Sequence, residues 1–377
     1  MRVIGNAVQR FLGAGPFAAG PFTELVQSRM RCTDRFAAGD WPDGVVLEQP
    51  ADAGVPARSL GLLGQKSSTQ SPAEQSYTSP VRRLFSLRDA CVAGADGVVW
   101  CPYVRRAFVE SVRRWHGEAQ DHPLFSSPRF PGPQPLSGLS LNLGSLDAGG
   151  FYHFLHESLP RLYLARPFLH RIDHFLCPGE KGGFHHDWLT LAGVPSEKII
   201  WLHGHTHWRC ERLLFTNQLT EDSRPTPWLF SALRNLVGWR PVSGGTGRIW
   251  LSRRDAPGRH LVWEEQLVSR LPGFELLGLA RRPAAEQVSL FASAEVIAGP
   301  HGAGFANLCF ASPGARVVEL LPDNTPRPLY ARLAATAGAT HAWASCDFTH
   351  PPADSGELSA AIMDFIAAPS ACGSMCQ

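Results

Sequence analysis

A glycine-rich segment carries the clearest chemical pattern in the sequence. His301-Gly302-Ala303-Gly304 follows the apolar run 295–298 and leads into a predicted short helix that contains Asn307. A loop between the carboxyl end of a strand and a helix N-terminus presents unpaired backbone N–H groups and the positive end of the helix dipole. The two glycines would let the main chain approach a ligand closely. The segment therefore predicts a binding site for a phosphate or a diphosphate.

Charged residues at the ends of two predicted strands extend this candidate site. Arg253, Arg254 and Arg259 follow the predicted strand 248–252, and Glu319 ends the strand after the glycine loop. Guanidinium groups match phosphate oxygens in a bidentate manner, and an acidic residue at a strand end commonly binds a ribose diol. We expect the arginines to clamp a diphosphate and Glu319 to bind the ribose. A solvated turn and a surface ion pair are the simpler alternatives for these residues.

A second constellation lies in the predicted helical run 151–168. His153, Glu157 and Arg161 are four residues apart, so they share one helix face if the helix passes through Pro160. A carboxylate one turn from an imidazole can orient it and raise its basicity, as a general base requires. A purely structural histidine is the alternative interpretation.

Two other kinds of chemistry fit the sequence less well. In His203-Gly204-His205-Thr206-His207 the alternate residues would face the same way on a strand, as metal ligands do. No acidic ligand accompanies them, so a polar turn explains the run and we expect no metal site. The segment 301–304 has a faint similarity to the oxyanion loop of esterases, but the sequence contains no G-x-S-x-G elbow, which excludes that class.

The elements that must position these residues alternate regularly after the glycine-rich stretch 241–247. The predicted strands are 248–252, 274–279, 295–298, 316–320 and 340–345, and the predicted helices are 262–271, 284–292, 328–337 and 355–366. Such alternation predicts a doubly wound parallel sheet. Upstream, short strands at 85–88 and 97–100 flank a turn, and further strands are expected at 139–143, 173–177 and 198–202.

This pattern predicts an α/β protein in which two Rossmann-like domains face a cleft. The expected parts are a partly irregular N-terminal extension at 1–80, an acceptor-side domain at 81–240, a linker at 241–247, and a nucleotide-binding domain at 248–377.

Composition and charge limit the function classes. The chain has 377 residues, of which 44% are hydrophobic, and its formal net charge is only +2, so no nucleic-acid partner is expected. Nine cysteines occur singly, which favours a reducing compartment. The N-terminus is a poor secretory signal and no apolar run suits a membrane span. We expect a cytoplasmic protein with no transmembrane segment, and peripheral membrane contact stays open.

Several blocks of the sequence, in order and spacing, resemble glycosyltransferase family 61. They are residues 251–254, 259–265, 286–297 and 301–319, together with the upstream block 152–162, and the resemblance covers residues 84–345. Trp263 departs from the pattern, because family members usually carry asparagine there.

The resemblance implies a GT-B architecture and an inverting, metal-independent transfer from a nucleotide sugar to a saccharide acceptor. On this basis we assign His153 as the base, with Glu157 orienting it or acting in its place, and Arg161 to the acceptor side. The donor would be bound by Arg253, Arg254, Arg259, His301, Gly302, Ala303, Gly304, Asn307 and Glu319. The donor would be of UDP type, with no cofactor.

The composition, rich in Ala, Arg, Gly and Pro, suggests a GC-rich bacterial genome. By analogy with the family that the sequence resembles, we then expect a surface or capsular polysaccharide as the acceptor. Two alternatives stay open. A glycine loop followed by an acidic strand end also describes an NAD(P)-dependent oxidoreductase, although the third glycine is absent. A non-catalytic sugar-binding protein is kept open by Trp263.

Overall fold

The chain folds into two compact units. The computed structural model describes residues 24–26, 44–63, 76–103, 106–112, 121–126, 131–220, 224–322, 328–352 and 355–368. Unit 1 comprises Met1–Ala51 and Pro80–Glu221, and unit 2 comprises Asp52–Ser79 and Asp222–Gln377. Each unit has its own sheet, which confirms the α/β class.

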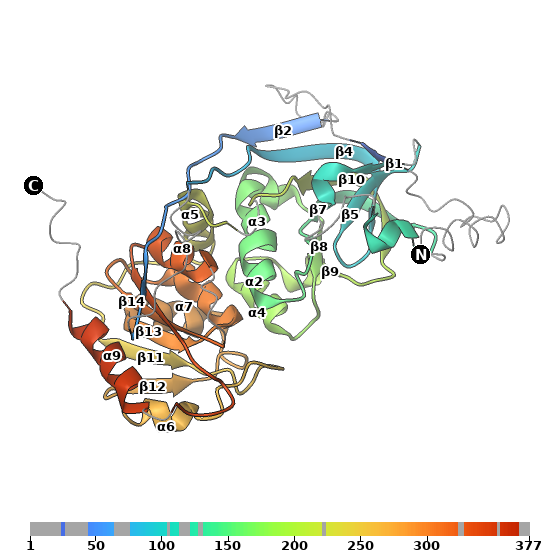
Figure 1. Ribbon diagram of the computed structural model, residues 1–377. Coiled ribbons are helices and arrows are strands. Elements are labelled where there is room, and N and C mark those ends of the chain that lie inside the picture. The colour runs from blue at the N-terminus through green and yellow to red at the C-terminus, as the bar shows by residue number, and fades with distance from the viewer. Residues whose placement is uncertain are drawn as a thin grey trace, which may run out of the picture. The chain divides into compact units, whose positions relative to one another are not determined.

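Unit 2 contains the parallel sheet that the alternating pattern predicted (Figure 1). Its strands lie in the order β12 (Phe274–Leu277), β11 (Gly247–Leu251), β13 (Ala294–Pro300), β14 (Arg316–Leu321), β15 (Thr340–Ser345) and β3 (Ser59–Gly61). All neighbouring pairs run parallel. After β11 the chain places β12 on one side, and then crosses to β13 on the other side. The carboxyl ends of β11 and β13 therefore form a topological switch point, where open α/β sheets bind ligands.

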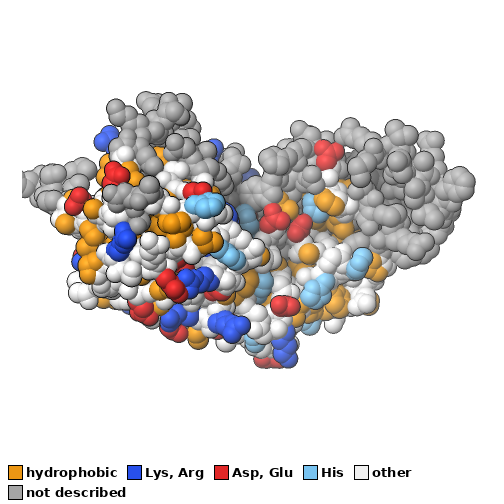
Figure 2. Space-filling view, turned by 60° about the horizontal axis from the view of Figure 1, so that its bottom comes forward, with side chains coloured by type: hydrophobic (Ala, Val, Ile, Leu, Met, Phe, Trp, Pro, Cys, Tyr) orange, Lys and Arg blue, Asp and Glu red, His pale blue; other side chains and the backbone are white. Residues whose placement is uncertain are grey.

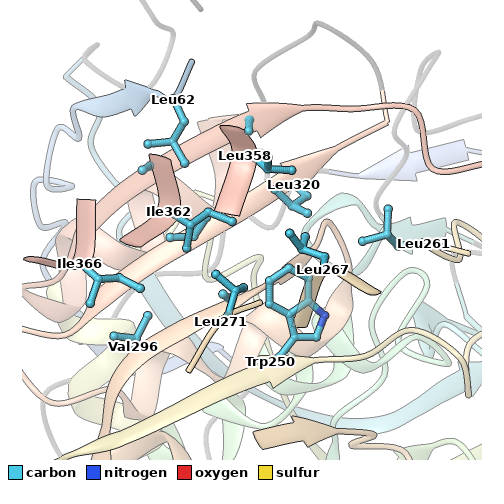
Figure 3. Close-up of a cluster of buried hydrophobic side chains, with 14 of the residues drawn as sticks. Leu62, Trp250, Leu261, Leu267, Leu271, Val296, Leu320, Leu358, Ile362 and Ile366 are labelled. Carbon is cyan, nitrogen blue, oxygen red and sulfur yellow. The ribbon is translucent and has the colours of Figure 1, made fainter. Parts of the chain in front are cut away.

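Helices cover both faces of this sheet (Figure 1). One face carries α6 (Glu264–Val268) and α9 (Ser355–Ala367), and the other carries α7 (Ala284–Ser293), the 3₁₀ helix η8 (Ala303–Phe310), α8 (Pro328–Ala337) and α5 (Pro227–Leu236). Beneath α6 and α9, side chains such as Leu267 and Ile362 pack against Trp250 and Val296 of the strands (Figure 3). This burial fixes the strands whose ends carry the charged residues.

The division between the units differs from the expected domain limits in two places. Strand β3 comes from the segment that we expected to be an irregular extension, and it pairs with β15. Helix α5 groups with unit 2, because Arg234 donates hydrogen bonds to the carbonyl oxygens of Cys309 and Ala311. The break therefore falls near residue 221 and not at 241–247. Residues 1–23, 27–43 and 64–75 of the expected extension lie outside the described residues.

Unit 1 has a mixed sheet, which differs from the Rossmann-like domain that we expected. Among the described residues its order is β1-β6-β5-β4-β10-β7-β8-β9, with β2 paired to β4. Strands β10, β7, β8 and β9 form a parallel series and β1 pairs with β6 in parallel, whereas β4 is antiparallel to β2, β5 and β10. The turn 94–97 explains part of the difference, since a connection this short joins only antiparallel strands.

The elements of unit 1 are as follows. The strands are β1 (Glu24–Val26), β2 (Gly44–Gln49), β4 (Arg82–Ala93), β5 (Val98–Cys101), β6 (Arg106–Phe108), β7 (Gln134–Asn142), β8 (His174–Pro178), β9 (Ile199–Leu202) and β10 (His207–Thr216). The helical segments are η2 (Val109–Ser111), η4 (Pro123–Ser126), α2 (Phe151–His153), η5 (Phe154–Ser158), α3 (Pro160–Leu164), η6 (Arg166–Arg171), α4 (Phe184–Leu191) and η7 (Ser196–Lys198).

The surface agrees with the small net charge. On the face that Figure 2 presents, Lys and Arg side chains lie next to Asp and Glu side chains. Within the described residues, no helix has the length and apolar character needed to cross a membrane.

The helical layer formed by α6 and α9 contributes strongly to the stability of unit 2, and one substitution tests this. We expect Ile362→Ala to lower the free energy of unfolding by about 2–5 kcal/mol, because the side chain is fully buried and a cavity would remain. Urea unfolding followed by tryptophan fluorescence measures the change. Val262→Ala is the control, since Val262 is 62% exposed and its loss is expected to change stability by less than ~0.5 kcal/mol. Equal effects of the two substitutions would show that this layer is not the stabilising contact.

Candidate active site

The glycine loop begins at the carboxyl end of β13, next to the end of β11. Gly299 has a φ of +154°, and a Cβ there would lie 2.6 Å from the carbonyl oxygen of Leu251. Only glycine therefore permits the two strand ends to approach this closely. After Pro300, the backbone N–H of His301 still bonds to the carbonyl oxygen of Leu320 at 2.8 Å. The loop is thus fixed to both neighbouring strands before η8 starts at Ala303.

Arg253 lies directly against this loop. A Cβ placed on Gly302 would come within 1.8 Å of Nη1 of Arg253, so the guanidinium group occupies the space that a side chain would fill. Nε and Nη2 of Arg253 donate to the carbonyl oxygen of Gly258 at 3.2 and 2.9 Å, which holds the group in place. The expected meeting of an arginine after β11 with the glycine loop after β13 is present.

A second arginine adds positive charge near the first. Arg259 has a φ of +58° and its side chain is exposed. Burial lowers the pKa of Arg253, and the nearby charge of Arg259 lowers it further. The guanidinium groups of Arg253 and Arg259 repel each other and lie near the backbone N–H groups of the glycine loop. A bound anion would stabilise this arrangement.

Arg254 does not join this cluster, although it was expected to bind the donor. Its guanidinium group forms an ion pair with Glu265 and lies 3.5 Å from a carboxylate oxygen of Glu264. Glu264 is buried and also accepts hydrogen bonds from Trp250 Nε1 at 2.8 Å and Ser252 Oγ at 2.6 Å. Arg254 therefore belongs to the junction between β11 and α6.

Asn307 stabilises the loop from inside the protein. Its side chain is fully buried, and its amide donates to Gln287 Oε1 at 3.0 Å and to the carbonyl oxygen of Gly304 at 3.3 Å. Gln287 in turn donates to the carbonyl oxygens of Leu279 and Arg282. Asn307 thus supports the backbone of the loop, and its direct contact with a donor stays a prediction.

Glu319 has a different environment from the one that a ribose-binding residue needs. It is fully buried, and its two carboxylate oxygens face His301 Nδ1 and His341 Nε2, the latter at 3.1 Å. Burial raises the pKa of Glu319, but the hydrogen bonds from His301 and His341 outweigh burial and leave the pKa below its usual value. The carboxylate is therefore ionised inside the protein and supports His301.

Sequence reasoning missed two members of this group, His341 and Ser59. Ser59 Oγ lies 2.7 Å from His341 Nδ1, so a side chain of β3 completes the chain of contacts. Only the pairing of β14 with β15, and of β15 with β3, brings these residues together. No local pattern in the sequence signals that pairing.

Trp263 has a structural role. Its ring is buried in the core beneath α6 and α9, and its indole N–H donates to the carbonyl oxygen of Asp347 at 2.8 Å. A large apolar residue with one hydrogen-bond donor thus fills the position where asparagine was expected.

In unit 1, the predicted pair of His153 and Glu157 is in contact. Nδ1 of His153 lies 3.4 Å from Oε1 of Glu157, and the side chains are 25% and 2% exposed. Ser145 Oγ lies 3.5 Å from the other carboxylate oxygen. The imidazole is therefore accessible to a substrate while its carboxylate partner is held inside.

The helix passes Pro160 through one wide turn. Residues 154–158 form a π-helical turn, in which the N–H of Leu159 bonds to the carbonyl oxygen of Phe154 at 2.9 Å. Pro160, which has no N–H, then begins α3. Arg161 is buried and donates to the carbonyl oxygen of Glu157 at 2.9 Å, so it braces this turn, and its place on the acceptor side stays a prediction. π-Turns of this kind occur frequently at functional sites.

The histidine run 203–207 forms a turn and the start of a strand. Trp100 Nε1 donates to His207 Nε2 at 3.1 Å, and His207 Nδ1 lies 2.6 Å from the carbonyl oxygen of Pro131. Both ring nitrogens of His207 are therefore engaged by protein groups. Over the described parts of the chain, no three His, Cys, Asp or Glu residues lie together as metal ligands would.

Comparison with known proteins agrees with the resemblance seen in the sequence. No curated protein matches the chain. Residues 151–318 match the model of the family described as Glycosyltransferase 61. The matched range begins at the helix of His153 and Glu157 and includes Arg253 and the glycine loop. This match agrees with the resemblance of the chain to glycosyltransferase family 61.

Proposed function

We propose that the protein is an inverting glycosyltransferase that moves a sugar from a nucleotide sugar, of UDP type, to a saccharide acceptor. One observation carries the proposal: the guanidinium group of Arg253 lies over Gly302 at the switch point between β11 and β13. Ligands of open α/β sheets bind at this position. The family match over residues 151–318 supports the transferase class.

The donor side of the proposed reaction needs positive charge at the leaving group. When the bond between C1 of the sugar and the diphosphate oxygen breaks, the bonding electrons stay on that oxygen. Arg253, Arg259 and the N–H groups of the loop 302–304 provide fixed positive charge and hydrogen-bond donors for it. Because protein groups fill this role, we propose that the transfer requires no divalent cation.

The acceptor side needs a proton acceptor. The acceptor hydroxyl oxygen forms the new bond to C1 from the face opposite the leaving group, and its proton must be taken up as that bond forms. We assign this proton to His153, whose imidazole is partly exposed and is oriented by the buried carboxylate of Glu157. Attack from the opposite face inverts the configuration at C1.

Wider aspects of the proposal follow from the resemblance and the composition. We assign the protein to the GT-B class, and the parallel sheet of unit 2 supports its nucleotide-binding half. A cytoplasmic bacterial enzyme of surface or capsular polysaccharide synthesis, with possible peripheral contact to a membrane, fits the composition.

Replacement of Arg253 tests the donor side. We expect Arg253→Ala to weaken UDP binding roughly tenfold to a hundredfold, because a charge-assisted contact to the diphosphate is lost. Isothermal titration calorimetry with UDP measures the affinity. Arg248→Ala is the matched control: Arg248 begins the same strand but pairs with Glu295 at the opposite edge of the sheet, so UDP affinity should be unchanged. If Arg253→Ala and the wild-type protein bind UDP with equal affinity, Arg253 does not bind the diphosphate. Tighter binding of NADH than of UDP would favour the alternative function, an NAD(P)-dependent oxidoreductase.

Gly302→Ala tests the same contact without removing a charge. Gly302 has an extended backbone, with a φ of −178°, so alanine is tolerated there by the backbone itself. Its methyl group would displace the guanidinium group of Arg253, and we expect UDP affinity to fall roughly tenfold. Gly132→Ala serves as control, since a Cβ there meets no atom within 4 Å. An undiminished affinity in Gly302→Ala would show that the position of Arg253 does not matter for the ligand.

Substitutions at His153 and Glu157 test the acceptor side. We expect His153→Ala to reduce transfer by roughly 10²–10⁴-fold, because the proton acceptor is lost, and Glu157→Gln to reduce it less. UDP affinity should stay unchanged in both variants. Product formation from a panel of UDP-sugars and oligosaccharide acceptors is followed by mass spectrometry, with His186→Ala on α4 as the control. If both variants transfer sugar at nearly the wild-type rate, His153 and Glu157 are not the proton-accepting pair. If the wild-type protein binds UDP-sugars but forms no product, the result supports a non-catalytic sugar-binding protein.

A further inference from the structure

Four side chains form a continuous chain of contacts behind the glycine loop. His301 Nδ1 contacts Glu319 Oε1, Glu319 Oε2 lies 3.1 Å from His341 Nε2, and His341 Nδ1 lies 2.7 Å from Ser59 Oγ. Glu319 is fully buried, and His341 and His301 are 4% and 8% exposed. The residues come from β14, β15, β3 and the loop after β13. An ionisable group this deep in the protein is stable only when its partners satisfy it.

The donors and acceptors in this chain determine the tautomer of each imidazole. An ionised carboxylate only accepts hydrogen bonds, so His301 Nδ1 and His341 Nε2 must each carry the hydrogen that faces Glu319. With that hydrogen on Nε2, Nδ1 of His341 can accept the hydroxyl hydrogen of Ser59. In His301 the nitrogen on the other edge of the ring, Nε2, has no hydrogen-bond partner among the residues that the structure describes.

The groups around His301 favour an incoming anion. Glu319 approaches from β14, and the ring of Tyr330 from α8 lies 5.0 Å from the imidazole. Burial raises the pKa of Tyr330, so this phenol stays neutral. Arg253 lies over Gly302, the residue next to His301, and Arg259 is close enough to affect both Arg253 and Tyr330. The imidazole thus contacts a buried negative charge, and the residue that follows it in the loop lies against the guanidinium group of Arg253.

We propose that Glu319 and His341 are positioning residues that hold His301 with its Nδ1 hydrogen inward, so that Nε2 takes up a proton when a nucleoside diphosphate binds. The proton comes from solvent, and the new N–H donates a hydrogen bond to a phosphate oxygen. The negative ligand in front and the carboxylate behind both favour the charged imidazole. Ser59 completes the arrangement by fixing the tautomer of His341. The inference rests on the proposed function, because it names the ligand of the same site.

The tautomer of His301 is tested first, in the absence of any ligand. Long-range ¹H–¹⁵N spectra of the full chain labelled with ¹⁵N-histidine distinguish a hydrogen on Nδ1 from a hydrogen on Nε2. The resonances of His301 are those that disappear in His301→Gln. We expect the Nδ1–H tautomer at pH 8, and an Nε2–H tautomer would overturn the proposal. This measurement depends on neither activity nor nucleotide.

Proton uptake is tested by calorimetry with UDP at pH 8 in buffers of different ionisation enthalpy. We expect the wild-type protein to take up a measurable fraction of one proton for each UDP bound. Glu319→Gln should abolish the uptake and weaken UDP binding roughly tenfold, because the carboxylate behind His301 is lost. Glu295→Gln, the same change at a half-exposed ion pair on β13, is the matched control and should keep both values.

Smaller changes along the chain of contacts protect the test against misfolding. Ser59→Ala removes one hydroxyl, and we expect a partial loss of proton uptake on UDP binding. His341→Gln removes the second imidazole, and we expect a nearly complete loss of proton uptake. Circular dichroism and thermal unfolding confirm that each variant is folded. Unchanged uptake in a folded Ser59→Ala, His341→Gln or Glu319→Gln would overturn the inference and leave the proposed function standing. If UDP does not bind the wild-type protein, both the inference about His301 and the proposed function are overturned, whichever tautomer His301 has.

Discussion

The contact between Arg253 and Gly302 is the constraint on which the candidate site depends. A guanidinium group can lie against the main chain of the loop only because residue 302 has no side chain. The approach of the strands beneath it likewise requires Gly299, whose φ of +154° and contact with Leu251 exclude other residues. The close contacts of the site thus depend on glycines, which have no side chain. The core under α6 and α9 fixes the strand ends that carry the residues of the site.

Support for the loop comes from polar side chains that do not reach the surface. Asn307 and Gln287 hold the backbone of the loop from one side, and Glu319 with His341 holds His301 from the other. Hydrogen bonds between buried polar groups make a site rigid, because an alternative arrangement would lose them. Few residues therefore face the proposed donor, and most of the polar residues nearby orient those few.

The sequence predicted the local features of the site better than the direction of its side chains. The strands expected at 248–252 and 295–298, the glycine loop, and the pair of His153 and Glu157 follow from periodicity and short spacing, which act within a few residues. The strands themselves end at Leu251 and Pro300. Asn307, Arg161 and Glu319 were placed near a ligand by their types, yet each one is buried and faces an internal partner. Arg254 instead pairs with the exposed Glu265. The choice depends on strand register and on packing between distant segments. The mixed sheet of unit 1 and the role of Ser59 escaped prediction for the same reason.

The path of the chain through β3 has a consequence for how unit 2 is made. Its sheet includes Ser59–Gly61, although the other five strands begin only at Gly247, with the greater part of unit 1 in between. During synthesis the early segment has no partner strand until β15, at Thr340–Ser345, has left the ribosome. Strand β15 of this sheet therefore pairs with a segment translated long before it, and a fragment that begins at β11 would lack both that edge and the hydroxyl group behind His341.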